Sequence, residues 1–264
     1  MEEIFGKFND ILFKEKGHEY YKKDKKLISV TSLISKYQNP FNENYWALWT
    51  ALKQSGNTLK IWQFKPDVID YKPFLTVTVA EIKKQWALEK DIGLTCGSAI
   101  HSYLEGLWNS KVLDIQCKYD RFEILKKQAQ NFYMEFKDRY TPVKMEFVIS
   151  NDFLAGQMDG LFYDKINQGY VLFDYKTDKE IKFENKYQKL LKPFDKLDDC
   201  NFNKYSIQTS LYKKIFEEET GKPIIDVKII WFCYTNDNYQ VIEPLPITEE
   251  INIIWQQYQS QLVD

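Results

Sequence analysis

Histidine and cysteine are scarce in this sequence, and the few that occur do not group. The chain has two histidines and four cysteines, and no Cys-x-x-Cys pair, so the spacing typical of a zinc site is absent. No apolar run approaches the length of a membrane-spanning helix, and residues 1–4 lack the basic-then-apolar pattern of a signal peptide. We therefore expect a soluble cytoplasmic protein with reduced thiols at Cys96, Cys117, Cys200 and Cys233.

An excess of charge of one sign is missing as well. Lys and Arg number 36 and Asp and Glu number 38, which gives a net charge of −2 and excludes a uniformly basic protein. A nucleic-acid partner would have to be held by a local basic patch. The length of 264 residues and the hydrophobic fraction of 44% are sufficient for a globular core, as one large domain or as one domain with an appendage.

The spacing of apolar residues predicts an α/β fold. A helix, an antiparallel meander of three strands, a second helix and a further strand would form a mixed sheet, with the polar candidate residues near one edge of it. The predicted helices are 43–53, 79–108, 119–139, 203–219 and 249–262, and the predicted strands are 27–34, 144–150, 153–163, 170–177, 224–234 and 239–242.

Local signals add detail to this pattern. Thr31 or Ser32 can cap a helix that follows the first strand, and Gly93 and Gly97 predict a break in the longest helix. Residues 56–76 contain two prolines and no periodic pattern, so we expect an irregular excursion there.

A carboxylate and an ammonium group stand two residues apart at the end of the apolar strand 170–177. Side chains of a strand alternate between its faces, so Asp174 and Lys176 point one way while Phe173 and Tyr175 point the other. An exposed ion pair, worth about 0–1 kcal/mol, is one interpretation. The apolar run before the pair favours a second interpretation, a functional pair, because burying charges is costly.

A second carboxylate, Asp159, lies one hairpin away in the sequence Gly-Gln-Met-Asp-Gly. Two acids that share a divalent cation, with a lysine beside them, are the minimum equipment for metal-assisted phosphodiester hydrolysis. The glycines could mark a plain turn, but the segment continues as a strand, so we expect Gly156 to allow a bulge or a close backbone approach. Glu146 faces either the same cavity as Asp159 or the solvent.

Two helical segments complete the set of candidates. His101 follows small residues that would let its helix approach a sheet closely, as a metal-bearing helix requires, and Glu105 lies one turn later on the same side. A structural or solvated histidine is the alternative. Gln208 and Tyr212 are four residues apart on a helix and therefore project together.

These motifs, in this order, resemble those of the RecB-type nuclease domain, a branch of the PD-(D/E)XK phosphodiesterase superfamily. The match covers about residues 94–215, and residues 29–34 resemble the opening strand and cap of the family. The resemblance implies a restriction-endonuclease-like core, a mixed central β-sheet flanked by helices, with an N-terminal helical extension. It implies a single domain over 1–264, with an N-terminal strand and helical region at 1–93 and the nuclease core at 94–264. The motifs are Gly97-Ser98-Ala99-Ile100-His101, Glu146, Gly156-Gln157-Met158-Asp159, Asp174-Tyr175-Lys176 and Gln208 with Tyr212.

The resemblance also implies a metal site. His101, Asp159 and Asp174 would be the ligands, together with the main-chain carbonyl of Tyr175. Hard oxygen ligands with one imidazole suit Mg²⁺ or Mn²⁺ better than zinc. An iron–sulfur cluster, which some family members carry, would need three grouped cysteines after the nuclease motifs, and this sequence has only two cysteines there.

The remaining matched residues would act on the substrate. Lys176 would be the catalytic lysine beside the two aspartates, Glu146 would help to hold a metal or a water molecule, and Gln208 and Tyr212 would position the nucleic-acid backbone. No helicase motif GxxxxGK[ST] is present, so the chain resembles a stand-alone nuclease.

Substrate contact is expected from locally basic helices after the strand 170–177. Lysines neutralise phosphates and aromatic rings stack on unpaired bases, which predicts a preference for single-stranded or frayed DNA. A solvated helix face that mixes both charges is the alternative. The lysines are Lys182, Lys186, Lys189, Lys192, Lys196, Lys204, Lys213 and Lys214, and the interleaved aromatic residues are Phe183, Tyr187, Phe194, Phe202 and Tyr205.

Three functional interpretations follow. The leading one is a Mg²⁺- or Mn²⁺-dependent DNA exonuclease acting on linear or single-stranded DNA in replication, recombination or repair, in the host cytoplasm if a phage encodes it. The second is a catalytically silent nuclease-fold protein that binds nucleic acid, and the third is an unrelated binding protein. Asp159, Asp174 and Lys176 occur together in this chain, which favours the first over the second.

Overall fold

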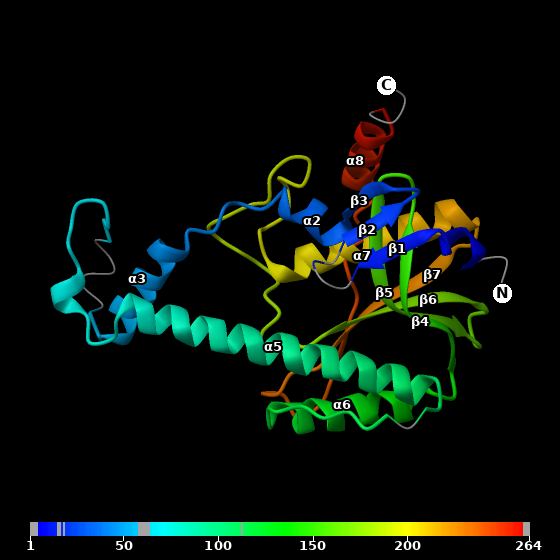
Figure 1. The fold of residues 1–264 in the computed structure, drawn as a ribbon, viewed down its shortest axis with the longest axis horizontal. Coiled ribbons are helices and arrows are strands. Elements are labelled where there is room, and N and C mark those ends of the chain that lie inside the picture. The colour runs from blue at the N-terminus through cyan, green and yellow to red at the C-terminus, as the bar shows by residue number, and fades with distance from the viewer. Residues whose placement is uncertain (1–4, 15–16, 18, 58–63, 112, 261–264) are drawn as a thin grey trace. The chain divides into compact units, whose positions relative to one another are not determined.

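The structure is a computed structural model that describes residues 5–260 apart from 15–16, 18, 58–63 and 112 (Figure 1). The chain divides into two compact units: one contains Met1–Asn39 and Cys96–Asp264, and the other contains Pro40–Thr95. The prediction of a single domain over 1–264 stays a prediction. No helix in the described part of the chain is both long enough and apolar enough to cross a membrane.

The larger unit is built on an open, mixed sheet of eight strands, which confirms the predicted α/β class. The strand order is β1-β2-β3-β5-β6-β7-β8, and β4 pairs with β5 outside this path. β3 and β5 are parallel, as are β6 and β7, and the other neighbours are antiparallel. The strands are β1 (Ile11–Lys14), β2 (Glu19–Lys22), β3 (Lys25–Ser29), β4 (Tyr140–Ser150), β5 (Leu154–Asp164), β6 (Gly169–Lys176), β7 (Ile224–Trp231) and β8 (Gln240–Ile242).

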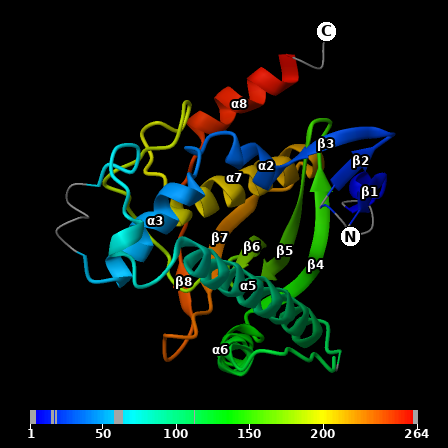
Figure 2. The ribbon, with the colours of Figure 1, turned by 60° about the vertical axis from the view of Figure 1, so that its left-hand side comes forward.

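Helices cover both faces of this sheet (Figures 1 and 2). The helices α2 (Val30–Ser35), α7 (Asn201–Thr220) and α8 (Glu249–Ser260) share one core with the sheet, in which Leu211 and Trp255 lie with Leu172. The other face packs on α6 (Arg121–Phe136), where the ring of Phe132 contacts those of Phe173, Tyr175 and Phe232. Leu172 and Phe173 thus point to opposite faces, as the alternation along a strand requires.

The smaller unit, residues 40–95, is helical. It contains α3 (Glu43–Gln54), the short 3₁₀ helix η2 (Lys72–Phe74) and the first part of α5 (Val79–Trp108). Ala47 and Ala51 of α3 pack with Ile82 of α5 in a small core. The irregular excursion predicted over 56–76 holds only η2 within its described residues, and 58–63 lie outside them.

Some predicted details are wrong. α5 continues through Gly93 and Gly97 without a break, because a glycine within a helix costs only about 1 kcal/mol and the neighbouring turns tolerate it. The predicted strand 27–34 ends at Ser29, and residues 30–34 belong to the helix α2. The cap of α2 is Ser29 instead of Thr31 or Ser32, because Ser29 Oγ accepts a hydrogen bond from Ser32 N at 3.0 Å. β1, β2 and the 3₁₀ helix η1 (Gly6–Phe8) had no predicted counterpart. The last residues of the predicted helix 249–262 lie outside the described residues.

Candidate metal-binding and active site

The candidate residues meet where two central strands of the sheet part. The antiparallel ladder between β5 and β6 ends at the pair Gly160 and Phe173, whereas β6 stays paired with β7 as far as Lys176. Beyond the end of the ladder, the main-chain N–H of Tyr175 donates to Asp159 Oδ2 at 2.6 Å. The carboxylate of Asp159 therefore takes the place of the main-chain carbonyl that a continued ladder would offer to Tyr175. The site lies at this fork on central strands, so the prediction of a sheet edge is wrong.

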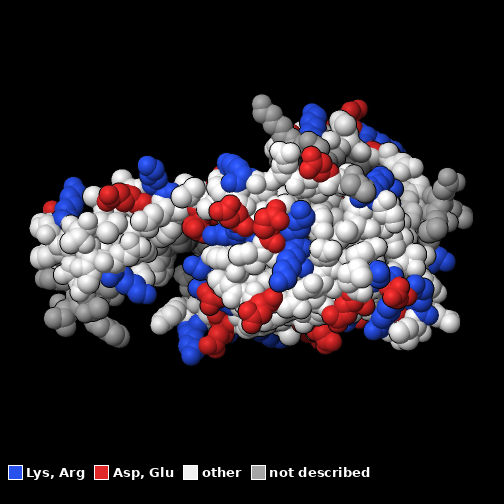
Figure 3. Space-filling view, turned by 90° about the horizontal axis from the view of Figure 1, so that it is seen from below, with Lys and Arg blue, Asp and Glu red and all other residues white. Residues whose placement is uncertain are grey.

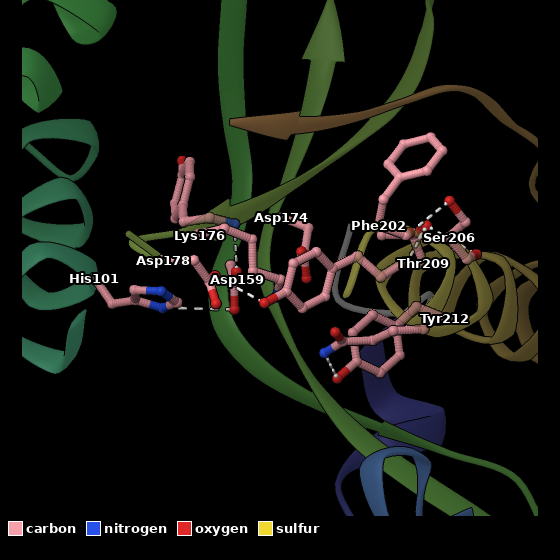
Figure 4. Close-up of polar contacts among 12 residues, drawn as sticks. His101, Asp159, Asp174, Lys176, Asp178, Phe202, Ser206, Thr209 and Tyr212 are labelled. Atoms are coloured by element: carbon pink, nitrogen blue, oxygen red, sulfur yellow. Dashed lines mark hydrogen bonds and ion pairs between the residues drawn. The ribbon is translucent and has the colours of Figure 1, made fainter. Parts of the chain in front are cut away.

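Asp174 and Lys176 form a buried ion pair in the fork. Their side chains share a face of β6, as predicted, and Lys176 Nζ lies 2.6 Å from Asp174 Oδ2 (Figure 4). The exposed fractions of the two side chains are 1% for Asp174 and 14% for Lys176, which excludes the interpretation as an exposed surface pair. Burial raises the pKa of Asp174 to about 6, although the Lys176 ammonium acts to lower it. Burial lowers the pKa of Lys176, but the carboxylates of Asp174 and Asp159 outweigh that effect, so the lysine stays protonated.

Asp174 is short of partners for its oxygens. Oδ1 has no hydrogen-bond partner among the described residues, and Oδ2 contacts only the ammonium of Lys176. Buried carboxylate oxygens normally accept hydrogen bonds or coordinate a cation. The free oxygen of Asp174 therefore fits a site for a cation.

His101, Glu146 and Asp159 form a second cluster beside this pair. Their potential ligand atoms lie within 4.8 Å of one another. His101 Nδ1 is 3.0 Å from Glu146 Oε1. It is 3.6 Å from Asp159 Oδ1, a contact drawn in Figure 4. Burial lowers the pKa of His101, but the two carboxylates outweigh it and raise the pKa to about 9. The cluster could hold a metal ion, and the imidazole is a partner of the acids instead of a solvated side chain.

The two acids of this cluster are held differently. Burial raises the pKa of Asp159, with the ammonium and imidazole groups nearby acting in the opposite direction. Glu146 has a positive φ of 44° within β4, a backbone conformation that costs about 1–3 kcal/mol in a residue other than glycine. Gln157 Nε2 donates to Glu146 Oε2 at 2.8 Å and thereby fixes the glutamate. Glu146 thus faces the site and not the solvent.

Gly97 brings the histidine helix close to the sheet. A Cβ atom at Gly97 would lie 3.1 Å from Thr177 Oγ1, just after β6. The prediction that small residues before His101 allow a close approach is therefore confirmed.

Gln208 and Tyr212 lie on α7 and contact each other. Gln208 Nε2 donates to Tyr212 Oη at 3.0 Å, and burial raises the pKa of Tyr212 well above its usual value. The ring of Tyr212 lies against Gly156, where a Cβ atom would be 2.5 Å from Tyr212 Cε1. The predicted close approach at Gly156 is confirmed: the ring of Tyr212 approaches the main chain of Gly156.

This contact predicts the effect of Gly156→Ala. The methyl group would collide with the ring of Tyr212, so we expect a loss of about 1–3 kcal/mol in the free energy of unfolding, measured by urea denaturation. Gly93→Ala is the matched control, because nothing lies within 4 Å of its Cβ position and it should stabilise by about 0.5–1 kcal/mol. Equal stability of the Gly156→Ala variant and the wild type would contradict the described position of the Tyr212 ring.

Three residues near the site had no predicted role in the metal site or beside Lys176: Gln157, Asp178 and Tyr205. Gln157 was only part of a matched motif, and Tyr205 was expected to contact the substrate. Lys176 Nζ lies 4.6 Å from the ring centroid of Tyr205, whose hydroxyl donates to Asp178 Oδ2 at 2.7 Å. Spacing alone could have indicated two of them. Gln157 precedes Asp159 by two residues on a strand, and Tyr205 precedes Gln208 by three residues on a helix, so each shares a face with a predicted residue.

The lysine-rich segment differs from its prediction. The prediction of basic helices is confirmed for Lys204, Lys213 and Lys214, which lie on α7. It is wrong for Lys182 to Lys196, because the chain between β6 and α7 is irregular, with one isolated bridge between Lys189 and Asp198. Carboxylates pair with six of the eight lysines, in agreement with the alternative of mixed charge: Lys182, Lys186, Lys189, Lys204, Lys213 and Lys214. On the face seen in Figure 3, the described basic and acidic side chains are also interspersed.

The donor set agrees with a hard divalent cation. The cluster offers carboxylate oxygens from Glu146 and Asp159 and one imidazole nitrogen, a set suited to Mg²⁺ or Mn²⁺. Asp174 is not part of the group His101, Glu146 and Asp159. Its oxygen without a hydrogen-bond partner belongs to the same fork between β5 and β6. The four cysteines are free thiols, as predicted. No protein-family model matches the chain, and no curated protein matches it in sequence.

Proposed function

We propose that this protein is a metal-dependent DNA nuclease with a RecB-type domain of the PD-(D/E)XK superfamily. The observation that carries the proposal is the convergence of Asp159, Asp174 and Lys176 in one buried fork, next to His101 and Glu146. A buried carboxylate with a free oxygen, a second carboxylate and a lysine are costly to bury together without a function. We further propose an exonuclease that acts on linear or single-stranded DNA in replication, recombination or repair.

The order of the elements supports this assignment. The second half of α5, the meander β4-β5-β6, the helix α7 and the strand β7 follow one another, with β7 parallel to β6. This is the order that the apolar spacing predicts, and a mixed sheet flanked by helices is what the resemblance implies for a restriction-endonuclease-like core. Asp159, Asp174 and Lys176 come from β5 and β6.

Each residue has a distinct part in the proposed chemistry. Asp159, Glu146 and His101 would hold a Mg²⁺ or Mn²⁺ ion, and Asp174 would add its free oxygen. When bound, such a cation polarises the phosphate and lowers the pKa of a coordinated water molecule. Lys176 places a fixed positive charge where negative charge develops on the scissile phosphate, in a site from which bulk water is largely excluded. Gln208 and Tyr212, hydrogen-bonded on α7, would position the nucleic-acid backbone.

The test combines cleavage with metal binding. Purified protein would be incubated with end-labelled linear duplex, single-stranded and closed circular DNA, in Mg²⁺, Mn²⁺ or EDTA. We expect metal-dependent release of nucleotides from linear DNA and no release in EDTA. In the same buffers Mn²⁺ should raise the midpoint of thermal unfolding of the wild type, because binding to the folded state stabilises it.

Matched acid variants make this test specific. Asp159→Asn should lose both the cleavage and the stabilisation by Mn²⁺, whereas Asp237→Asn, at an exposed acid outside the site, should keep both. Binding of DNA without cleavage in any metal would favour the silent nuclease-fold alternative. Neither binding nor cleavage, with no effect of metal on unfolding, would overturn the proposal.

A further inference from the structure

One face of α7 lies against the end of β6, and it carries Tyr205 in addition to Gln208 and Tyr212. The three residues are spaced three and four apart, so they project from the same side of the helix. Gln208 and Tyr212 contact each other. Tyr205 instead contacts Lys176 and Asp178, which belong to β6 and to the segment directly after it.

The contacts of Tyr205 leave it little freedom. Its ring packs on a small apolar cluster that includes Phe202 and Ile229, and its hydroxyl donates to Asp178 Oδ2 at 2.7 Å. Asp178 is itself fixed, because Trp231 Nε1 donates to its main-chain carbonyl at 2.7 Å. The aromatic face that Lys176 meets is therefore anchored at both ends of the tyrosine side chain.

The ammonium of Lys176 contacts two groups that attract a cation, a carboxylate and the face of an aromatic ring. Asp174 Oδ2 is 2.6 Å away, and the centroid of the Tyr205 ring is 4.6 Å away. An ammonium carries three N–H donors on a flexible four-carbon chain, and one carboxylate cannot fix its direction alone. The negative face of an aromatic ring attracts a cation within about 6 Å of its centroid, and more strongly when water is excluded.

From this geometry we infer that Tyr205 is the positioning residue of Lys176, with Asp178 as its anchor. The ring holds the ammonium in the fork between β5 and β6, so that its remaining N–H donors stay directed at the substrate. The inference rests on the proposed function for its catalytic consequence. The placement of Lys176 against the ring can be tested without any activity.

The first measurement is therefore structural. Protons above an aromatic ring are shifted upfield in NMR spectra, so the ε-methylene signal of Lys176 should be upfield of the other lysines in the wild type. Tyr205→Phe keeps the ring and should keep this shift, whereas Tyr205→Leu should lose it. Tyr187→Leu, at a tyrosine that is 94% exposed, is the matched control and should leave the signal unchanged. The same Lys176 signal in the wild type and in Tyr205→Leu would overturn the inference.

The second measurement is kinetic. Tyr205→Leu should lower kcat for DNA cleavage roughly tenfold with KM unchanged, because a misplaced ammonium affects the transition state and not substrate binding. Tyr205→Phe and Asp178→Asn should each lower kcat a few-fold, and the double variant should be no slower than either, because both break one hydrogen bond. Additive losses, or a change confined to KM, would overturn the positioning role.

The two measurements separate the two proposals. If the wild type cleaves no DNA, the proposed function fails, while the NMR comparison still decides whether Tyr205 holds Lys176. If the wild type cleaves DNA and the upfield shift is absent, the nuclease assignment stands and the role of Tyr205 is excluded. Thermal unfolding of each variant shows that it is folded.

Discussion

Exchange of Asp174 for asparagine should reduce metal-dependent DNA cleavage by on the order of a thousandfold or more. The carboxylate supplies an oxygen without a hydrogen-bond partner and is the ionic partner of Lys176. The amide of asparagine carries no negative charge, so it can neither bind a cation as the carboxylate would nor form an ion pair with Lys176. Single-turnover cleavage of linear DNA at saturating Mn²⁺ measures the loss. Lys222→Met, at an exposed lysine just after the C-terminal end of α7, is the control and should cleave at the wild-type rate.

The same exchange should destabilise the metal-free protein. Removal of one partner of a buried ion pair leaves an uncompensated charge and costs about 3–5 kcal/mol, whereas replacement of both partners by groups of similar volume is often neutral. Asp174→Asn and Lys176→Met should each lower the free energy of unfolding, and the double variant should recover most of the loss without recovering cleavage. Full activity of any of the three variants would contradict the proposed roles. Additive destabilisation in the double variant would contradict the buried pair.

The stability of the metal-free protein should fall as the pH rises from about 6.5 to 9. In the folded state the pKa of His101 is raised to about 9, against about 6.5 in an unfolded chain, because Glu146 and Asp159 stabilise the imidazolium. A raised histidine pKa stabilises the folded state fully below pH 6.5, and this contribution is lost as the pH passes through 9. The shift corresponds to about 3 kcal/mol, measured by urea denaturation in EDTA across this range.

His101→Gln is the control for this titration. It should remove most of the pH dependence between 6.5 and 9. The raised pKa of Asp174, about 6, acts at lower pH and should rise further in this variant, because the imidazolium of His101 acts to lower it. Mn²⁺ should bind more tightly at pH 9 than at pH 7 in the wild type, because the cation and the proton compete for the imidazole. A wild type with constant stability over this range, or a His101→Gln variant with the same slope, would contradict the ion pair with Glu146 and Asp159.

The sequence predicted the parts of the site that depend on short-range periodicity. Asp174 and Lys176 share a strand face because the period of a strand is two residues, and Gln208 contacts Tyr212 because helix positions four apart are neighbours. The meander 140–176 was also recognisable, since its apolar strands are separated by turn residues. Such features need no knowledge of long-range contacts.

Short-range periodicity does not predict features that depend on pairing between distant segments of the chain. The fork exists because β5 pairs with β6 only from Gly160 onward, and no local signal marks the residue at which the pairing of two strands begins. The strands β1 and β2 are only four residues long and lack a clear alternation of apolar and polar residues, so they were missed. The segment 182–196 was misread as helical because charge and aromatic content are the same in an irregular loop.

The hydrogen bond between Tyr175 and Asp159 determines how the second acid can coordinate. Oδ2 already accepts a main-chain proton at 2.6 Å, so Oδ1 is the oxygen left to meet an ion. Asp159 would thus offer Oδ1 to a cation while Oδ2 holds the end of β6 in place. One carboxylate would serve both the site and the strand that carries Asp174 and Lys176.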